Sequence, residues 1–249
     1  MALDTDPALL SYALVLAIGS IAGLVSGIVG TGATIILLPV LAIVFGPKAA
    51  IPIMAIVALM SNFAKITSWW REIDWRATAA YAAGGIPGAA LGARTMLSLP
   101  PRVVDIALGA FFLIMIPGRR WLASRQYKVG LPLLAIGGLF IGFLTGIVVS
   151  TGPITVPLFS AYGLVKGGFI ATEAASSLAM YISKAITFRS FGALPTDIVL
   201  QGLITGSSVM AGTYLAKLVV ERLAVTTFQR LLEVVMLISG ISLIVAALR

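Results

Sequence analysis

Two similar stretches of the sequence place hydroxyl residues and glycine inside long apolar runs. The first reads GLVSGIVGTGATIILLPVL from Gly23 to Leu41, and the second reads GFLTGIVVSTGPITVPLF from Gly142 to Phe159. A helix that stops and restarts at such a point leaves N–H groups, hydroxyls and the positive end of a helix dipole free to bind an anion. The predicted substrate-binding residues at the two breaks are Thr31, Gly32, Ala33, Thr34, Ser150, Thr151 and Gly152.

Two lysines lie within apolar runs, where an ionisable side chain usually has a functional role. Lys65 and Lys184 occupy corresponding runs of the two halves, one position apart in the alignment. Each side chain is long enough to reach toward the middle of the membrane, so that two cations would flank one central anion. We add Asn62 and Ser183 as candidate hydrogen-bonding residues beside them. The alternative is that both ammonium groups point to the nearer interface and only anchor their helices.

The composition argues against several kinds of chemistry. The 249-residue chain has no histidine and no cysteine, so it offers no imidazole or thiolate ligand, and we expect no metal and no cofactor. No acidic pair is placed at membrane depth, which argues against acid–base catalysis, and we predict that the protein is not an enzyme. The net charge of +8 does not indicate nucleic-acid binding, because the basic residues fall mostly in short loops between apolar runs.

The elements that carry these residues are predicted to lie in lipid. Hydrophobic residues make up 59% of the chain and charged residues 10%, against about 25% charged in soluble domains. The apolar segments are 9–29, 33–46, 49–69, 76–97, 103–118, 129–149, 153–163, 169–188, 198–217 and 227–247. The segments 33–46 and 153–163 are short for a crossing of about 20 residues, so we predict broken or re-entrant half-helices there. The predicted fold is an all-α integral membrane protein with one transmembrane domain over residues 1–249.

The segments form two sets of five that resemble each other. MSNFAKIT at Met60–Thr67 corresponds to MYISKAIT at Met180–Thr187, and glycine 88 and 92 correspond to Ser208 and Gly212. Together with the two opening stretches, these matches indicate an internal duplication. Repeat 1 is predicted over about 9–118 and repeat 2 over about 129–249, with the loop 119–128 between them.

The distribution of lysine and arginine indicates how the repeats are oriented. With five crossings in each half and the N-terminus outside, the inside loops hold twice as many basic residues as the outside loops, whereas four crossings give an almost even split. Because cytoplasmic loops are enriched in basic residues, five crossings are favoured, and an odd number inverts the second repeat. We expect a multi-pass protein in the bilayer of the inner (plasma) membrane, with the loop 119–128 inside and a homodimer as a further assembly.

Several motifs together resemble the TauE/SafE sulfite exporter family. They are the two Thr-Gly stretches, the third segment with its lysine, the EIDW turn at Glu72–Trp75 and GGIPGAALGA at Gly84–Ala93. The family signature of Gly-x-Gly-Gly-Gly, four residues and Pro is altered here to hydroxyl-containing versions that end at Pro39 and Pro157. The resemblance covers essentially the whole chain, and it implies transport of small sulfur-containing anions such as sulfite or organosulfonates, usually outward.

The sequence therefore predicts a secondary transporter, an exporter of a small sulfur-containing anion bound between the two breaks and reached alternately from each side. An anion channel is the alternative, and a membrane-embedded enzyme is less favoured. We interpret Gly19, Gly23 and Gly27 as helix-packing contacts rather than binding residues.

Two expectations concern the acidic residues. Asp74 and Asp197 precede apolar segments and are predicted to cap helices. Glu173 and Glu233 are not expected to be buried, so the sequence does not favour a dedicated proton relay, and it leaves the energy coupling open.

Overall fold

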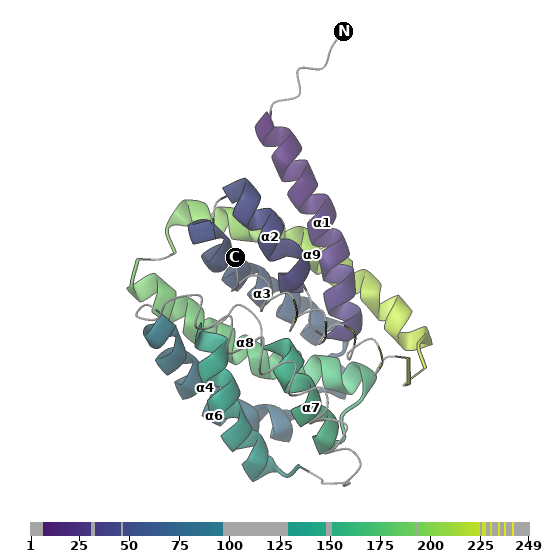
Figure 1. Cartoon of the computed structure of the whole chain (residues 1–249). Coiled ribbons are helices and arrows are strands. Elements are labelled where there is room, and N and C mark those ends of the chain that lie inside the picture. The colour runs from purple at the N-terminus through teal and green to yellow at the C-terminus, as the bar shows by residue number, and fades with distance from the viewer. Residues whose placement is uncertain are drawn as a thin grey trace.

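The computed structural model describes residues 7–30, 33–45, 47–96, 129–147, 151–192 and 194–224, with single positions between 226 and 241. These ranges contain helices and no β-strand, which confirms the predicted all-α class (Figure 1). The elements are α1 (Pro7–Val29), α2 (Ala33–Phe45), α3 (Pro47–Ser68), η1 (Trp70–Glu72), α4 (Trp75–Met96), α6 (Leu131–Ile147), α7 (Gly152–Tyr162), α8 (Lys166–Ser190) and α9 (Thr196–Arg222). The predicted segment 103–118, the loop 119–128 and most of 227–247 lie outside the described residues.

The two short helices expected from the sequence are present. Helix α2 has 13 residues and α7 has 11, fewer than the roughly 20 that a perpendicular crossing needs. Each follows a break in the chain: α1 ends at Val29 before α2 starts at Ala33, and α6 ends at Ile147 before α7 starts at Gly152. The breaks therefore fall in the two Thr-Gly stretches.

The long helices pack in pairs along small residues. Helix α4 lies against α6 and α1 against α9, while α8 crosses the middle and contacts both α3 and α4 (Figure 1). A side chain at Gly23 would overlap the carbonyl oxygen of Val209 on α9, and one at Gly88 would overlap that of Leu139 on α6. Small residues let helix backbones approach closely in this way. The interpretation of the glycines of α1 as packing contacts is confirmed.

The main helix contacts occur in equivalent pairs: exchanging the two predicted repeats turns one contact of each pair into the other. In the sequence alignment α1 corresponds to α6, α3 to α8 and α4 to α9. The contact of α1 with α9 then matches that of α6 with α4, and the contact of α3 with α9 matches that of α8 with α4. Each predicted repeat thus packs its first helix on a helix of the other, an arrangement that a two-fold relation between duplicated halves would produce.

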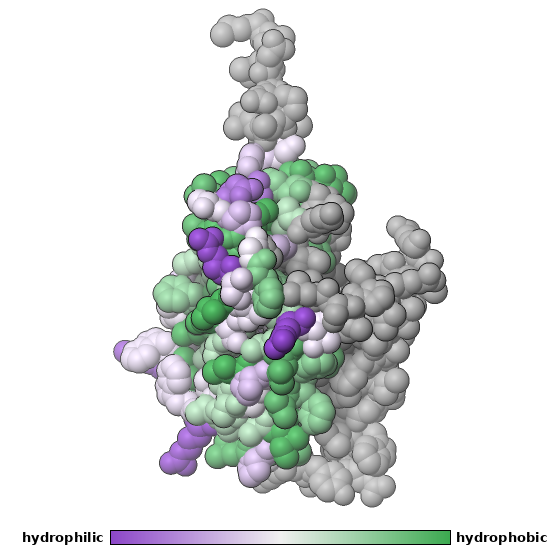
Figure 2. Space-filling view, turned by 90° about the vertical axis from the view of Figure 1, so that its left-hand side faces the viewer, coloured by the Kyte–Doolittle hydropathy of each residue, from purple (hydrophilic) through white to green (hydrophobic). Residues whose placement is uncertain are grey.

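Apolar side chains also cover the outside of the helix bundle. Phe140 is 67% exposed and Ile186 is 65% exposed. Hydrophobic residues spread over much of the described part of the face in Figure 2, and hydrophilic residues form small separate groups on it. Within the described ranges, Ser11–Ile28 of α1 and Thr196–Arg222 of α9 are long and apolar enough to cross a membrane. Such an exposed apolar surface fits contact with lipid better than contact with water.

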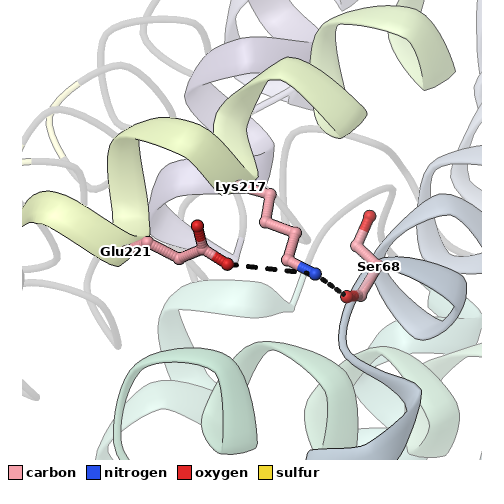
Figure 3. Close-up of polar contacts among 3 residues, drawn as sticks. All are labelled: Ser68, Lys217 and Glu221. Atoms are coloured by element: carbon pink, nitrogen blue, oxygen red, sulfur yellow. Dashed lines mark hydrogen bonds and ion pairs between the residues drawn. The ribbon is translucent and has the colours of Figure 1, made fainter.

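The side chain of Lys217 binds the C-terminal end of α3. Lys217 of α9 donates a hydrogen bond of 2.9 Å to the carbonyl oxygen of Ser68, the last residue of α3, and its ammonium lies 3.9 Å from the carboxylate of Glu221 (Figure 3). The ammonium also lies 5.1 Å from the ring centre of Trp69. A cation is favourable there, because the free carbonyls at a helix C-terminus form the negative end of its dipole.

One of the two predicted aspartate caps is confirmed and the other is wrong. Oδ1 of Asp74 accepts hydrogen bonds of 3.0 Å from the backbone N–H groups of Arg76 and Ala77, and so it caps α4. Helix α9 instead begins at Thr196, with no side-chain cap, and Asp197 lies within its first turn. Pro195, in extended backbone, is the residue before the helix, two residues earlier than the predicted cap, so the helix starts before the aspartate.

Candidate functional site

A small polar cavity lies between the two breaks and the central helices α3 and α8. Its volume is about 40 Å³, enough for a few water molecules. Repeat 1 contributes Ser26, Gly30, Thr34, Ser61, Asn62 and Lys65 to its polar lining. Repeat 2 contributes Thr151, Glu173, Ser177 and Tyr181, so the cavity lies where the two predicted repeats meet.

Lys65 holds the first break in place. Its ammonium is buried and donates a hydrogen bond of 2.7 Å to the carbonyl oxygen of Gly30, just after the end of α1. Gly30 has a φ of +84°, and a side chain on it would also meet the ring of Phe169, so this position requires glycine. Lys65 therefore places a positive charge both at the carbonyl end of α1 and in the cavity wall.

Lys184 makes a similar contact at the second break but does not line the cavity. Lys184 is 1% exposed, and its ammonium donates a hydrogen bond of 2.9 Å to the carbonyl oxygen of Thr145 near the end of α6. The hydroxyls of Thr145 and Thr151 lie 2.5 Å apart, and Thr151 reaches the cavity. Both lysines thus bind backbone carbonyls rather than pointing to an interface. Of the two predicted cations, only Lys65 lines the cavity. Lys184 lies behind the cavity wall, bound to Thr145, whose hydroxyl contacts that of Thr151.

The structure brings together five of the residues predicted from the sequence. Ala33, Thr34, Asn62, Lys65 and Thr151 line one cavity. The other predicted residues lie elsewhere: Ser183 donates a hydrogen bond of 3.3 Å to the carbonyl oxygen of Ile86, and Gly152 is the first residue of α7. Three predicted residues, Thr31, Gly32 and Ser150, lie outside the described part of the chain.

Glu173 is the charged residue of the cavity lining that sequence reasoning missed. It was expected not to be buried, yet it is only 5% exposed and lines the cavity. Its Oε1 accepts hydrogen bonds from the hydroxyls of Ser177, at 2.7 Å, and Thr155, at 3.4 Å. Glu173, Ser177 and Tyr181 are spaced four apart along α8 and share one face of the helix. This four-residue spacing is the feature of the sequence that could have indicated a polar face on the helix.

The cavity combines features that attract an anion. The first residue of α2, Ala33, and the residue before α7, Thr151, both line it, so the N-terminal ends of two short helices meet there. Helix N-termini favour negative charge, and the Lys65 ammonium adds a full positive charge. The carboxylate of Glu173 opposes these groups. Lys65 and Glu173 both line the cavity, and no ion pair joins these two described residues.

Comparison with known proteins assigns the family. A family model described as sulfite exporter TauE/SafE matches residues 15–243, almost the whole chain. No curated protein and no solved structure gives a significant match. Proteins of the matched family are membrane transporters, and the match confirms the resemblance drawn from the sequence motifs. The chain belongs to the sulfite exporter TauE/SafE family.

Proposed function

We propose that this protein is a secondary transporter that exports a small sulfur-containing anion, such as sulfite or an organosulfonate, and binds it in the cavity between the two breaks. The observation that carries the proposal is the meeting of the Lys65 ammonium with the N-terminal ends of α2 and α7 in one cavity. Broken helices whose N-termini point at an anion are a recurring substrate site of secondary transporters.

The helix packing supports alternating access to this site. The exchange of contacts between the two halves is expected if they are inverted copies that rock against each other around a central ligand. In the proposed orientation the protein crosses the inner membrane five times per half, with the N-terminus outside and the loop 119–128 inside. Labelling from each side of sealed vesicles tests this arrangement. Finding the N-terminus and that loop on the same side would contradict the inverted repeat.

A carrier accounts for the site better than a channel or an enzyme does. A channel needs a continuous wet pathway, whereas the polar groups described here converge on one small cavity between α3, α8 and the breaks. The cavity presents donors and charges suited to holding an oxyanion, and the family consists of transporters. An anion channel is the second candidate.

Flux into proteoliposomes distinguishes these functions. The purified protein would be tested with sulfite, sulfate, thiosulfate, methanesulfonate, taurine and chloride. A carrier gives saturable flux of sulfite or a sulfonate that stops when Lys65 is replaced by methionine. Lys217→Met is the matched control, because Lys217 also binds a helix-end carbonyl but lies away from the cavity lining. A chloride current proportional to voltage, with no saturable sulfur-anion flux, would contradict the proposal.

A further inference from the structure

Glu173 places a partly satisfied carboxylate in a site built for an anion. Glu173 is buried, with only 5% of its surface exposed. Oε1 has two hydroxyl donors, whereas Oε2 has no hydrogen-bond partner among the described residues. A buried carboxylate oxygen without a partner is costly in the ionised form. The unpartnered oxygen therefore points to a ligand or a proton that completes the site.

An anion in this cavity would be repelled by ionised Glu173 and bound by protonated Glu173. A protonated carboxyl can donate one hydrogen bond, whereas the ionised form can only accept. Within the described residues, the titratable groups that interact electrostatically with Glu173 are Lys65 on α3, Tyr81 on α4 and Tyr181 on α8. The two phenols are neutral near pH 7. Lys65 is thus the one cation among these groups, and the net charge of the site depends on the state of Glu173.

Glu173 has no acidic counterpart in the other predicted repeat. At the 120-residue offset that aligns Met60 with Met180, the position equivalent to Glu173 is Ile53, a fully buried apolar residue of α3. Both halves have a lysine bound to a carbonyl at the break, but only one has a carboxylate here. Because the same packing is made with isoleucine in the other half, the helix pair does not need an acid at this position.

We propose that Glu173 is the proton-binding residue of this transporter, and that one proton on its carboxyl and one anion beside Lys65 bind cooperatively in the same cavity. This inference rests on the proposed function, because it concerns the same site. The proton taken from solvent stays on the carboxyl, which donates its hydrogen bond to the anion. One proton and one monovalent anion add no net charge to the loaded cavity. By linkage, the proton strengthens anion binding by the same factor by which the anion strengthens proton binding.

Calorimetric titration of the purified full chain in nanodiscs tests the coupling. Methanesulfonate is the probe, because it stays a monoanion between pH 5 and 8, whereas sulfite itself takes up a proton near neutral pH. We expect affinity to rise about 5- to 150-fold as the pH falls through the titration of the carboxyl, the range typical of coupled sites. Repeating the titration in buffers of different ionisation enthalpy should show uptake of one proton per anion.

Glu173→Gln should bind methanesulfonate with an affinity that no longer depends on pH, and without proton uptake. Glu221→Gln removes an exposed carboxylate and should keep the wild-type pH dependence. If the glutamine variant does not fold, Glu173→Asp replaces it, and the proton uptake should persist with a shifted midpoint.

The outcomes separate this inference from the function on which it rests. Anion binding that is independent of pH in the wild type, or that keeps its pH dependence in Glu173→Gln, overturns the role of Glu173 and leaves the transporter proposal standing. A failure of every sulfur anion to bind the wild type at any pH overturns both.

Discussion

The sharpest test of the binding site replaces Lys65 with methionine. Methionine keeps an unbranched side chain of similar length but removes the ammonium. In the wild type Lys65 is 4% exposed, and its ammonium donates a hydrogen bond of 2.7 Å to the carbonyl oxygen of Gly30 and contributes a positive charge to the cavity lining. The substitution therefore takes the charge out of the site while changing the packing volume little.

The expected loss follows from the type of contact. A hydrogen bond to a charged group contributes about 1.5–3 kcal/mol, and each 1.4 kcal/mol is about tenfold in a dissociation constant. Lys65→Met should therefore weaken binding of methanesulfonate by roughly 10- to 150-fold. The Gly30 carbonyl also loses its donor, but it faces a cavity that water can enter, so we expect the free energy of unfolding to fall by only about 1 kcal/mol.

Titration calorimetry measures the affinity, and thermal unfolding in the same nanodiscs measures the stability. Lys217→Met is the matched control, because it removes an ammonium that donates 2.9 Å to the Ser68 carbonyl without lining the cavity. Its melting temperature should fall by a similar amount while its affinity stays at the wild-type value. The reasoning is refuted if folded Lys65→Met binds as tightly as the wild type, or if Lys217→Met loses affinity to the same extent.

Three further predictions separate binding from stability. Lys184→Met should lower the melting temperature and weaken anion binding much less than Lys65→Met does, because its ammonium lies behind the cavity wall; equal losses in a titration would contradict this. Gly30→Ala forces a residue with a side chain into a φ of +84°, so stability and affinity should both fall, whereas Gly192→Ala, at +73° and in open space, should lose stability by about 1 kcal/mol with unchanged affinity. Asp74→Ala should reduce the free energy of unfolding by about 1 kcal/mol through loss of its cap, and Asp197→Ala, which caps nothing, should change the melting temperature far less.

Most of the helices could be predicted from local properties of the sequence. Hydropathy indicated long apolar runs, and glycine, hydroxyl residues and proline marked where those runs are broken. The predicted segments 33–46 and 153–163 therefore correspond to α2, Ala33–Phe45, and α7, Gly152–Tyr162, within a residue or two at each end. These features depend on neighbouring residues, so a single sequence contains them.

The burial of Glu173 could not be predicted in the same way. The sequence placed it near the start of an apolar segment, where a glutamate is usually exposed to water. In the structure α8 begins three residues earlier than predicted, at Lys166, and runs through the centre of the molecule against α3, α4 and α7. The environment of Glu173 is set by α7, which directly precedes α8, and by α3 and α4, which are distant in the sequence, so only the tertiary arrangement reveals it.

The different positions of the two lysines have a simple geometric cause. Residues Ser61 of α3 and Tyr181 of α8 are equivalent at the 120-residue offset, and both line the cavity. Lys65 lies four residues after Ser61, which is about one turn, and so it faces the same way. Lys184 lies three residues after Tyr181, and this difference of one residue turns its side chain by about 100° around the helix. The sequence alignment already showed that the two lysines differ by one position. Only the structure shows the consequence, which is that Lys65 lines the cavity and Lys184 does not.

These differences separate the scaffold of the molecule from its ligand site. The two halves share the glycine-packed helix pairs and a lysine bound to a carbonyl near each break, which hold helices in place. They also share the breaks themselves, where each half brings one helix N-terminus to the cavity. The features that differ are the cavity position of Lys65 and the replacement of Ile53 by Glu173, and both change the charge of the cavity. A transporter with inverted repeats needs a symmetric scaffold, because the same motion must open the site to either side. Its ligand needs no such symmetry, so the residues that break the repeat are the ones in which substrate and coupling proton should be sought.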